Sequence, residues 1–211
     1  IGNCVMKLYT ADGIPNPRIV DVAMYEKNLN LERIIVDFLE GENRASSFLA
    51  KNHAGQIPVL ELDDGTIISE VTAIIEYFEE VCPDPFLVGA TAKERAEARM
   101  WARRVDLAVM EPMSMAFKYG IGKNYFEKRI TVYPEAAESM KNKAQDGLVW
   151  LDNVLAGKQF LCGDRMTYGD IMLYCYTDYF KKTGQKVESG LVHLTHVLDS
   201  IAERPSVQKT A

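Results

Sequence analysis

Gly55-Gln56-Ile57-Pro58-Val59-Leu60 and, shortly after it, Ser69-Glu70-Val71-Thr72-Ala73-Ile74 are the stretches that decide the fold. Between them, Asp63-Asp64-Gly65 separates two short apolar runs, which predicts a β-hairpin because glycine accepts the positive φ that such turns need. Ser69 is the expected N-cap of a helix that follows. The apolar residues of this helix recur at the helical spacing: Val71, Ile74, Ile75 and Phe78.

Upstream of the hairpin, the chain alternates between strand-like and helix-like segments. Residues 4–9 and 31–36 are short apolar runs of the kind that form buried strands. Between them, Asn16 is the expected N-cap of a helix and Pro17 its first residue. Residues 44–52 are expected to form a short helix. This order of strands and helices predicts a small α/β layer.

Downstream, the two prolines of Cys82-Pro83-Asp84-Pro85 interrupt the pattern and predict a linker. Residues 91–117 then predict a long helix with a kink near Pro112. Thr167 and Asp170 predict a capping box that opens a buried, apolar helix. Two further helical patterns lie at residues 140–155 and 191–201. We therefore expect an α/β domain at residues 1–82, a linker at 83–90 and an all-α helical domain at 91–211.

The composition is that of an ordinary globular protein, with 47% apolar and 26% charged residues. A net charge of −6 disfavours nonspecific binding of nucleic acid, which depends on clustered Lys and Arg. No apolar run approaches the ~20 residues that cross a bilayer, and the first residues do not resemble a signal peptide. The cysteines lack paired or metal-binding spacing, which favours a reducing, cytoplasmic compartment and argues against a metal site. They are Cys4, Cys82, Cys162 and Cys175.

Taken together, these motifs resemble the cytosolic glutathione transferase family over nearly the whole chain. The segment ending in Pro58-Val59-Leu60 is similar to the cis-proline turn of thioredoxin-like domains. The segment that begins at Ser69 is similar to the family's T-E-S-x-A-I helix start. Met6-Lys7-Leu8-Tyr9 and Pro15-Asn16-Pro17-Arg18 resemble the first strand and helix of bacterial members. Residues 163–171 resemble their C-terminal capping motif. The resemblance implies an α/β thioredoxin-like domain followed by an all-helical domain.

The resemblance also implies a glutathione site in the first domain. In the family, the residue before the cis-proline pairs its backbone with the cysteinyl part of glutathione, as an added strand would. Here this residue is Ile57, before Pro58 and beside Gln56. Glu70 is expected to hold the α-ammonium group at a helix start whose N–H groups suit a carboxylate. Val71 replaces the usual serine, and the lost hydrogen bond to a charged group costs about 1.5–3 kcal/mol.

Glutathione reacts as a thiolate, whereas a free thiol with a pKa near ~8.5 is mostly protonated at neutral pH. Ile14 and Pro17 occupy positions where the family often has Ser or Cys, and neither can donate a hydrogen bond. The preferred thiol-activating residue is therefore Asn16, as in the Asn-type nu-class and prion-like relatives, because its amide can donate at a helix N-terminus. Thr10 is the second candidate. A purely structural role of Asn16 as an N-cap stays open.

The reaction that the resemblance implies is attack of the glutathione thiolate on a hydrophobic electrophile, with glutathione as co-substrate. Arg104, Ala108 and Met113 are expected to bind this second substrate. A homodimer is expected from the family. Two alternatives stay open, because a fold does not determine an activity. One is a glutathione-dependent reductase of disulfides or peroxides, and the other is a noncatalytic glutathione-binding or scaffold module.

Overall fold

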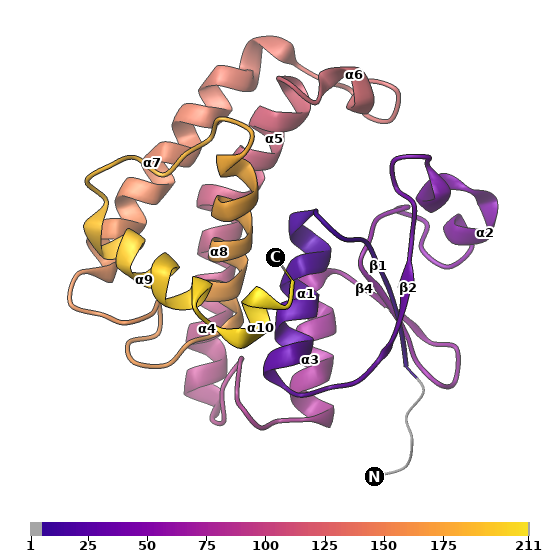
Figure 1. The fold of residues 1–211 in the computed structure, drawn as a ribbon, viewed down its shortest axis with the longest axis horizontal. Helices are drawn as coiled ribbons and strands as arrows, with labels where there is room; N and C mark the ends of the chain where they lie inside the picture. The colour runs from indigo at the N-terminus through magenta and orange to yellow at the C-terminus, as the bar shows by residue number, and fades with distance from the viewer. Residues whose placement is uncertain (1–5, 211) are drawn as a thin grey trace. The chain divides into compact units, whose positions relative to one another are not determined.

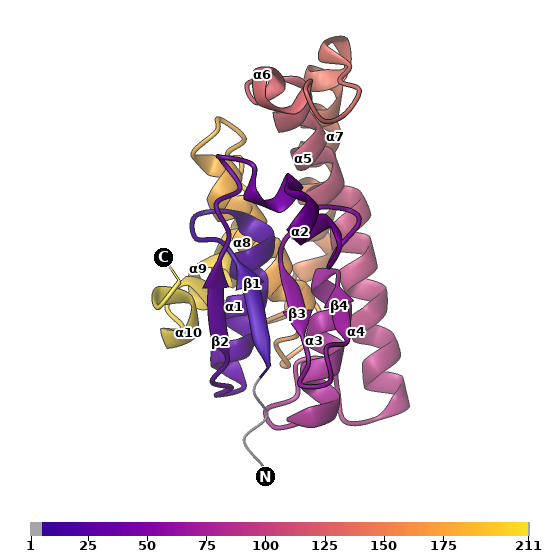
Figure 2. The same cartoon turned by 90° about the vertical axis from the view of Figure 1, so that its right-hand side faces the viewer.

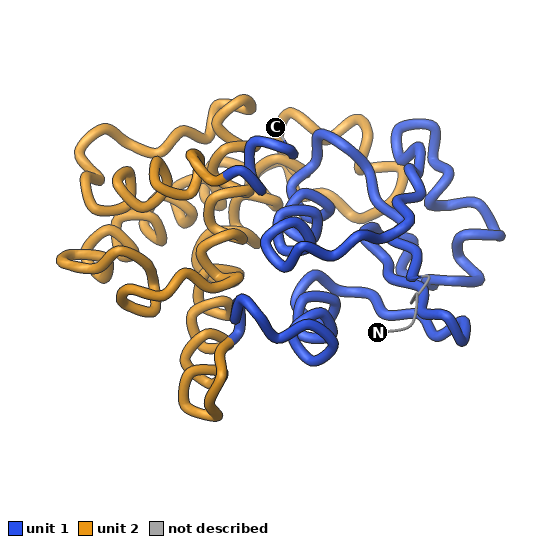
Figure 3. Tube along the Cα trace, turned by 60° about the horizontal axis from the view of Figure 1, so that its bottom comes forward, with its two compact units in different colours: residues 1–88, 205–211 blue, residues 89–204 orange. Residues whose placement is uncertain are grey.

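A computed structural model describes residues 6–210, which divide into two compact units (Figure 3). Within the described residues, unit 1 comprises 6–88 and 205–210, and unit 2 comprises 89–204. The domain limits expected from the sequence stay a prediction. Of the predicted first strand, Cys4 and Val5 lie outside the described residues.

Unit 1 contains a four-stranded mixed sheet with the strand order β2-β1-β3-β4 (Figures 1 and 2). Strand β1 runs parallel to β2 and antiparallel to β3, which forms the predicted hairpin with β4. Its elements are β1 (Lys7–Thr10), α1 (Pro15–Glu26), β2 (Glu32–Ile35), a 3-10 turn (Glu42–Arg44), α2 (Ser46–Leu49), β3 (Val59–Glu61), β4 (Ile67–Ser69), α3 (Val71–Val81) and α10 (Pro205–Gln208). This arrangement confirms the α/β thioredoxin-like class.

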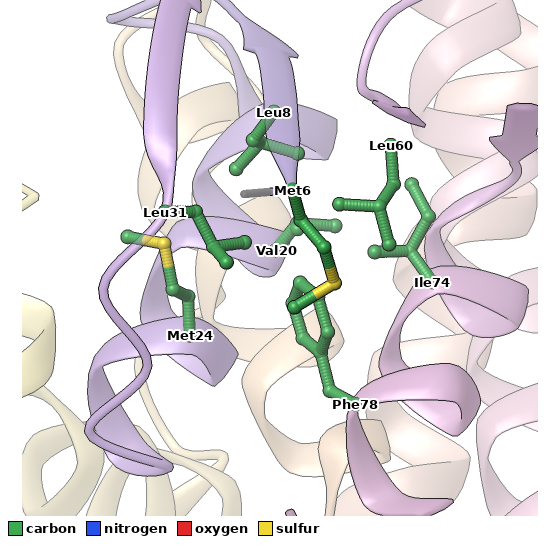
Figure 4. Packing of buried hydrophobic residues seen from close by; sticks show 8 residues of the cluster. All are labelled: Met6, Leu8, Val20, Met24, Leu31, Leu60, Ile74 and Phe78. Carbon is green, nitrogen blue, oxygen red and sulfur yellow. The ribbon is translucent and has the colours of Figure 1, made fainter. Parts of the chain in front are cut away.

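The core of unit 1 lies between one face of the sheet and the helices α1 and α3 (Figure 4). Leu8 of β1 pairs with Leu60 of β3, and both side chains point to this face. Because side chains alternate along a strand, Tyr9 and Val59 take part in a second cluster, with Phe48 of α2. The buried members of the first cluster are Met6, Leu8, Val20, Met24, Leu31, Leu60, Ile74 and Phe78.

Two predicted helix starts were wrong by one or two residues. Helix α1 begins at Pro15 with the extended Ile14 as its N-cap, so Asn16 is the second helical residue. Pro15 suits the first helical position as well as Pro17 does, because neither needs its missing N–H there. Helix α3 has Glu70 and not Ser69 as its N-cap, since Ser69 is the last residue of β4.

Unit 2 is all-helical, as predicted. Its most buried helix is α8, in which every residue from Tyr168 to Thr177 is buried. Among residues 6–210, no helix is both long and apolar enough to cross a membrane. The elements are α4 (Ala92–Val105), a π-helical turn (Asp106–Met110), α5 (Glu111–Tyr119), α6 (Lys123–Phe126), a 3-10 turn (Pro134–Ala136), α7 (Ala137–Leu155), α8 (Tyr168–Lys181) and α9 (Val192–Ala202).

The irregularity expected near Pro112 takes the form of the π-helical turn just before it. Pro112 has no N–H to donate to the carbonyl of Ala108, and the N–H of Glu111 instead reaches the carbonyl of Asp106. The carbonyl oxygen of Ala108 lies against Gly147 of α7, where an added Cβ would come within 2.2 Å of it. Glycine is therefore required at this contact between α7 and the π-helical turn.

The predicted capping box at the start of α8 is confirmed. The Asp170 carboxylate accepts hydrogen bonds from the N–H of Thr167 at 2.8 Å, the hydroxyl of Thr167 at 3.0 Å and the N–H of Leu161 at 2.8 Å. The side chain is fully buried. Burial outweighs these three donors and raises the pKa of Asp170 to about 6.

This raised pKa predicts a pH dependence of stability. The folded state binds the proton of Asp170 more tightly than the unfolded chain does. The stability that this proton adds to the folded state is therefore fully present below about pH 4 and is lost as the pH rises through about 6. Relative to Asp170→Asn, the unfolding free energy of the wild type should fall by about 2 kcal/mol between pH 4 and pH 7. Urea unfolding across this range measures it, and NMR titration of the wild-type carboxyl gives a second value. Parallel pH profiles for the two proteins would argue against this assignment.

Candidate functional site

The loop before β3 contains backbone groups that have no hydrogen-bond partner within the described chain. The Ile57–Pro58 bond is cis, as predicted. Ile57 and Pro58 are buried, while Gln56 is exposed. Among residues 6–210, the N–H and C=O of Ile57 make no hydrogen bond. Because buried backbone groups are nearly always paired, this segment suits an extended ligand that pairs with it as a strand would.

Two asparagines that the sequence did not single out hold this loop in place. The side-chain amide of Asn43 donates to the carbonyl of Gly55 at 2.7 Å, and that of Asn52 donates to the carbonyl of Gln56 at 2.9 Å. Gly55 has a φ of +57°, and a Cβ there would lie 2.8 Å from the guanidinium of Arg44. The loop is therefore shaped by side-chain contacts on both sides.

Glu70 lies at the start of α3 in a strained backbone conformation. Its φ of 77° is rare for a residue other than glycine, and such strain often occurs at functional sites. Its side chain is exposed and does not cap the helix. The first N–H groups of α3, from Val71 to Ala73, have no partner within the described residues. An acid thus stands beside N–H donors, which suits a ligand that carries both an ammonium and a carboxylate.

The two predicted thiol-activating residues lie in different surroundings. Asn16 is half-buried in the first turn of α1, between Pro15 and Pro17. Since proline has no N–H, Asn16 supplies the hydrogen-bond donors of residues 15–17. Thr10, in contrast, is fully buried, and its hydroxyl lies 3.4 Å from the Asp21 carboxylate. The structure therefore does not support Thr10 as a donor to a bound thiol, because a carboxylate inside the unit already engages its hydroxyl.

An arginine on β2 ties the loop between β1 and α1 to the helix. The guanidinium of Arg33 binds both carboxylate oxygens of Asp21, at 3.1 and 3.0 Å, and that of Asp12 at 2.8 Å. Burial raises the pKa of Asp21 above its ordinary value, although Arg33 opposes this shift. The sequence does not pair these residues. Their effect is to position the loop that precedes Asn16.

The three residues predicted to bind a second substrate lie in unit 2 and differ in exposure. Arg104 is exposed, and its guanidinium lies 4.9 Å from the ring centre of Trp101. Ala108 belongs to the π-helical turn that packs on Gly147. Met113 is fully buried. As a correction to the sequence analysis, Met113 has no surface to offer a ligand in this structure.

These features define a class of protein: a thioredoxin-like unit with a cis-proline loop, and an all-helical unit. The model for the glutathione S-transferase N-terminal domain matches residues 15–81, and that for the C-terminal domain matches residues 117–209. Glutathione S-transferase 2 of Saccharomyces cerevisiae is 31% identical over 209 residues, which cover 97% of this chain and 88% of that relative. The chain belongs to the glutathione S-transferase family.

Solved structures agree with this membership. The glutathione S-transferase domain-containing protein of Marinobacter aquaeolei has a TM-score of 0.89 and 35% identity, with 95% of this chain and 99% of that one covered. Gtt2 of Saccharomyces cerevisiae has a TM-score of 0.91 and 30% identity, with 97% and 100% covered. Relatives with other names include a maleylacetoacetate isomerase and elongation factor 1-gamma. Membership in the family therefore does not by itself define the reaction.

Proposed function

We propose that this protein binds glutathione in unit 1 and transfers it to a hydrophobic electrophile. The observation that carries the proposal is the unpartnered backbone of Ile57 next to the cis Pro58. A cysteinyl residue of an extended tripeptide pairs with such a backbone in the manner of an added strand. The names of the relatives above support glutathione as that tripeptide.

The helix start at Glu70 complements the other end of glutathione. The γ-glutamyl group carries an ammonium and a carboxylate. The carboxylate of Glu70 suits the ammonium, and the N–H groups of Val71 and Thr72 suit the carboxylate. Val71 contributes its N–H without the hydroxyl of a serine. This combination supports glutathione over a plain anion.

For the reaction, Asn16 is the proposed donor to the glutathione sulfur. A hydrogen bond to the thiolate stabilises its charge and lowers the thiol pKa, which raises the fraction of the reactive form. The sulfur then attacks the electrophilic carbon, a new bond from sulfur to carbon forms, and the leaving group departs with its electron pair. Arg104 is the proposed contact for the electrophile, because it alone of the three predicted residues is exposed.

A noncatalytic glutathione-binding module is the second candidate. The observation in its favour is the scarcity of side-chain donors around the start of α1, where Ile14 and Pro17 have none and the Thr10 hydroxyl is engaged by Asp21. Glutathione titration and turnover of chlorodinitrobenzene separate the two candidates. Binding with turnover supports the transferase, binding without turnover supports the module, and absence of binding at millimolar glutathione overturns both.

Replacing Glu70 tests the binding site directly. Glu70→Ala should raise the dissociation constant of glutathione by about 10- to 100-fold, because an ionic hydrogen bond contributes about 1.5–3 kcal/mol. Calorimetric titration measures this change. Asp63→Ala is the matched control, since Asp63 is an exposed acid in the hairpin turn of the same unit. Equal affinities of the two variants for glutathione would show that Glu70 does not bind this ligand.

Glu70→Gly separates the role of the side chain from that of the backbone. Glycine adopts the φ of 77° without strain, so the unfolding free energy should rise by about 1 kcal/mol while the affinity for glutathione falls as in Glu70→Ala. Thermal unfolding and titration of the same sample give both values. A stability that falls together with affinity would mean that the Glu70 side chain supports the fold and not the ligand.

A further inference from the structure

Helices α8 and α9, which Figure 1 labels, border a groove that lies wholly within unit 2 and has no role in the proposed transfer. Its volume is about 320 Å³, which is within the range of small-molecule sites. The loop from α8 to α9 closes one side. The side-chain amides of Gln145 and Gln185 hold this loop through the carbonyls of Lys186 and Met113, at 2.9 and 3.0 Å. The groove is therefore preformed.

The floor of the groove is mainly apolar. Tyr174 of α8, Leu198 and Ala202 of α9 and Val187 of the loop line it. On each helix the lining residues recur at the spacing of one helical face, which explains how two helices build a continuous surface. Such a floor suits the apolar body of a small ligand, because burial of that body removes apolar surface from water.

Charged side chains of both signs border this floor. Lys181 and Lys186 contribute two ammonium groups, and Asp199 of α9 contributes a carboxylate, with the hydroxyl of Thr195 one turn before it. Within residues 6–210, none of these four side chains has a hydrogen-bond or ion-pair partner, whereas Asp178 of α8, a second carboxylate in the lining, already has a partner. A groove that offers unpaired cations and an unpaired carboxylate around an apolar floor complements a ligand that carries both charges and an apolar body.

We propose that the groove between α8 and α9 binds small apolar zwitterions, the class formed by apolar α-amino acids and short peptides. The ligand carboxylate pairs with Lys181 and Lys186, its ammonium pairs with Asp199, and its side chain covers Leu198 and Tyr174. A simple organic anion would leave the carboxylate of Asp199 unpaired, and a simple amine would leave the ammonium groups of Lys181 and Lys186 unpaired. All residues of this site belong to unit 2, whereas the proposed glutathione site lies in unit 1.

Three related probes test the proposal on the full chain without glutathione. L-phenylalanine carries both charges, 3-phenylpropanoate lacks the ammonium, and 2-phenylethylamine lacks the carboxylate. In titrations followed by two-dimensional NMR, L-phenylalanine should bind about fivefold more tightly than either analogue, and the shifted amides should cluster at Val187, Thr195 and Leu198. Asp199→Asn should abolish the preference over 3-phenylpropanoate. Lys181→Met with Lys186→Met should abolish the preference over 2-phenylethylamine.

Matched variants on the same elements complete the test. Thr195→Trp fills the groove from an exposed position and should abolish binding. His196→Trp, at the next exposed residue of α9, does not line the groove and should bind as the wild type does. The proposal is overturned if L-phenylalanine fails to bind up to its solubility limit. It is also overturned if the three probes bind equally, if the shifts cluster elsewhere, or if the two Trp variants behave alike.

Discussion

Lys27→Met should lower the free energy of unfolding by about 3–5 kcal/mol, because it leaves a buried carboxylate without its counter-charge. The side chains of Lys27 and Glu79 are 0% and 2% exposed, and the ammonium lies 2.6 Å from the carboxylate. The ammonium also donates to the carbonyls of Cys82 and Pro85, at 2.7 and 2.9 Å. No water can replace these contacts at a site with so little exposure.

The pair also holds the segment that leaves α3. The Glu79 carboxylate accepts from the N–H groups of Leu87 and Val88, at 3.0 and 2.8 Å. Lys27, at the end of α1, and Glu79, on α3, therefore fix residues 82–88 against these two helices. Glu79→Gln should also be costly, because the two N–H groups bind different oxygens of the carboxylate and an amide has only one oxygen to accept them.

Urea unfolding followed by circular dichroism measures the change, and hydrogen exchange of the α1 and α3 amides localises it to unit 1. Trp101 and Trp150 both lie in unit 2, so tryptophan fluorescence reports the other unit. Lys93→Met, at an exposed position of α4, is the control and should have no measurable effect. The combined Lys27→Met and Glu79→Gln variant should lose less than the sum of the single losses. A loss for Lys27→Met no larger than for Lys93→Met would contradict the assigned role.

The elements that the sequence predicted well are those with a periodic apolar pattern or a strong turn signal. The hairpin around Gly65, the apolar face of α3 and the buried helix α8 all follow from such local patterns. The cis-proline loop was predicted by resemblance. Helix α10 was missed, although Pro205 at its first position is a known helix-start signal.

The features that escaped prediction depend on residues far apart in the chain. Lys27 and Glu79 are 52 positions apart on different helices, and nothing in either local pattern marks them as buried. Likewise, the guanidinium of Arg33, on β2, forms an ion pair with the carboxylate of Asp21, on α1. The sequence also contained no indication of the positive φ at Glu70, because glycine or asparagine usually occupies such a conformation. The sequence therefore predicted which loops form the candidate site, and the structure added the side chains that hold them.

For the proposed transfer reaction, Asn16→Ala should lower kcat by about 100-fold while the glutathione dissociation constant changes less than threefold. A loss of kcat of this size is typical when an enzyme loses one preorganised hydrogen-bond donor to an anion that develops or is stabilised in the reaction. The variant keeps the backbone N–H of Asn16 and removes only the amide, so the loss reports the side chain alone. Pro15 and Pro17 have no N–H that could take over.

The pKa of bound glutathione's thiol gives a readout that a merely structural role would not move. It should rise in Asn16→Ala, because the thiolate loses a stabilising hydrogen bond, and the pH–rate profile should shift upward with it. Ultraviolet titration of the thiolate in the binary complex measures the change. Asn16→Ser, which restores a donor, should recover part of the rate, whereas Thr10→Ala should leave the thiol pKa unchanged since the Thr10 hydroxyl is engaged by Asp21. An unchanged thiol pKa in Asn16→Ala, with glutathione still bound, would leave Asn16 as a structural residue of the first turn of α1 and would require another donor.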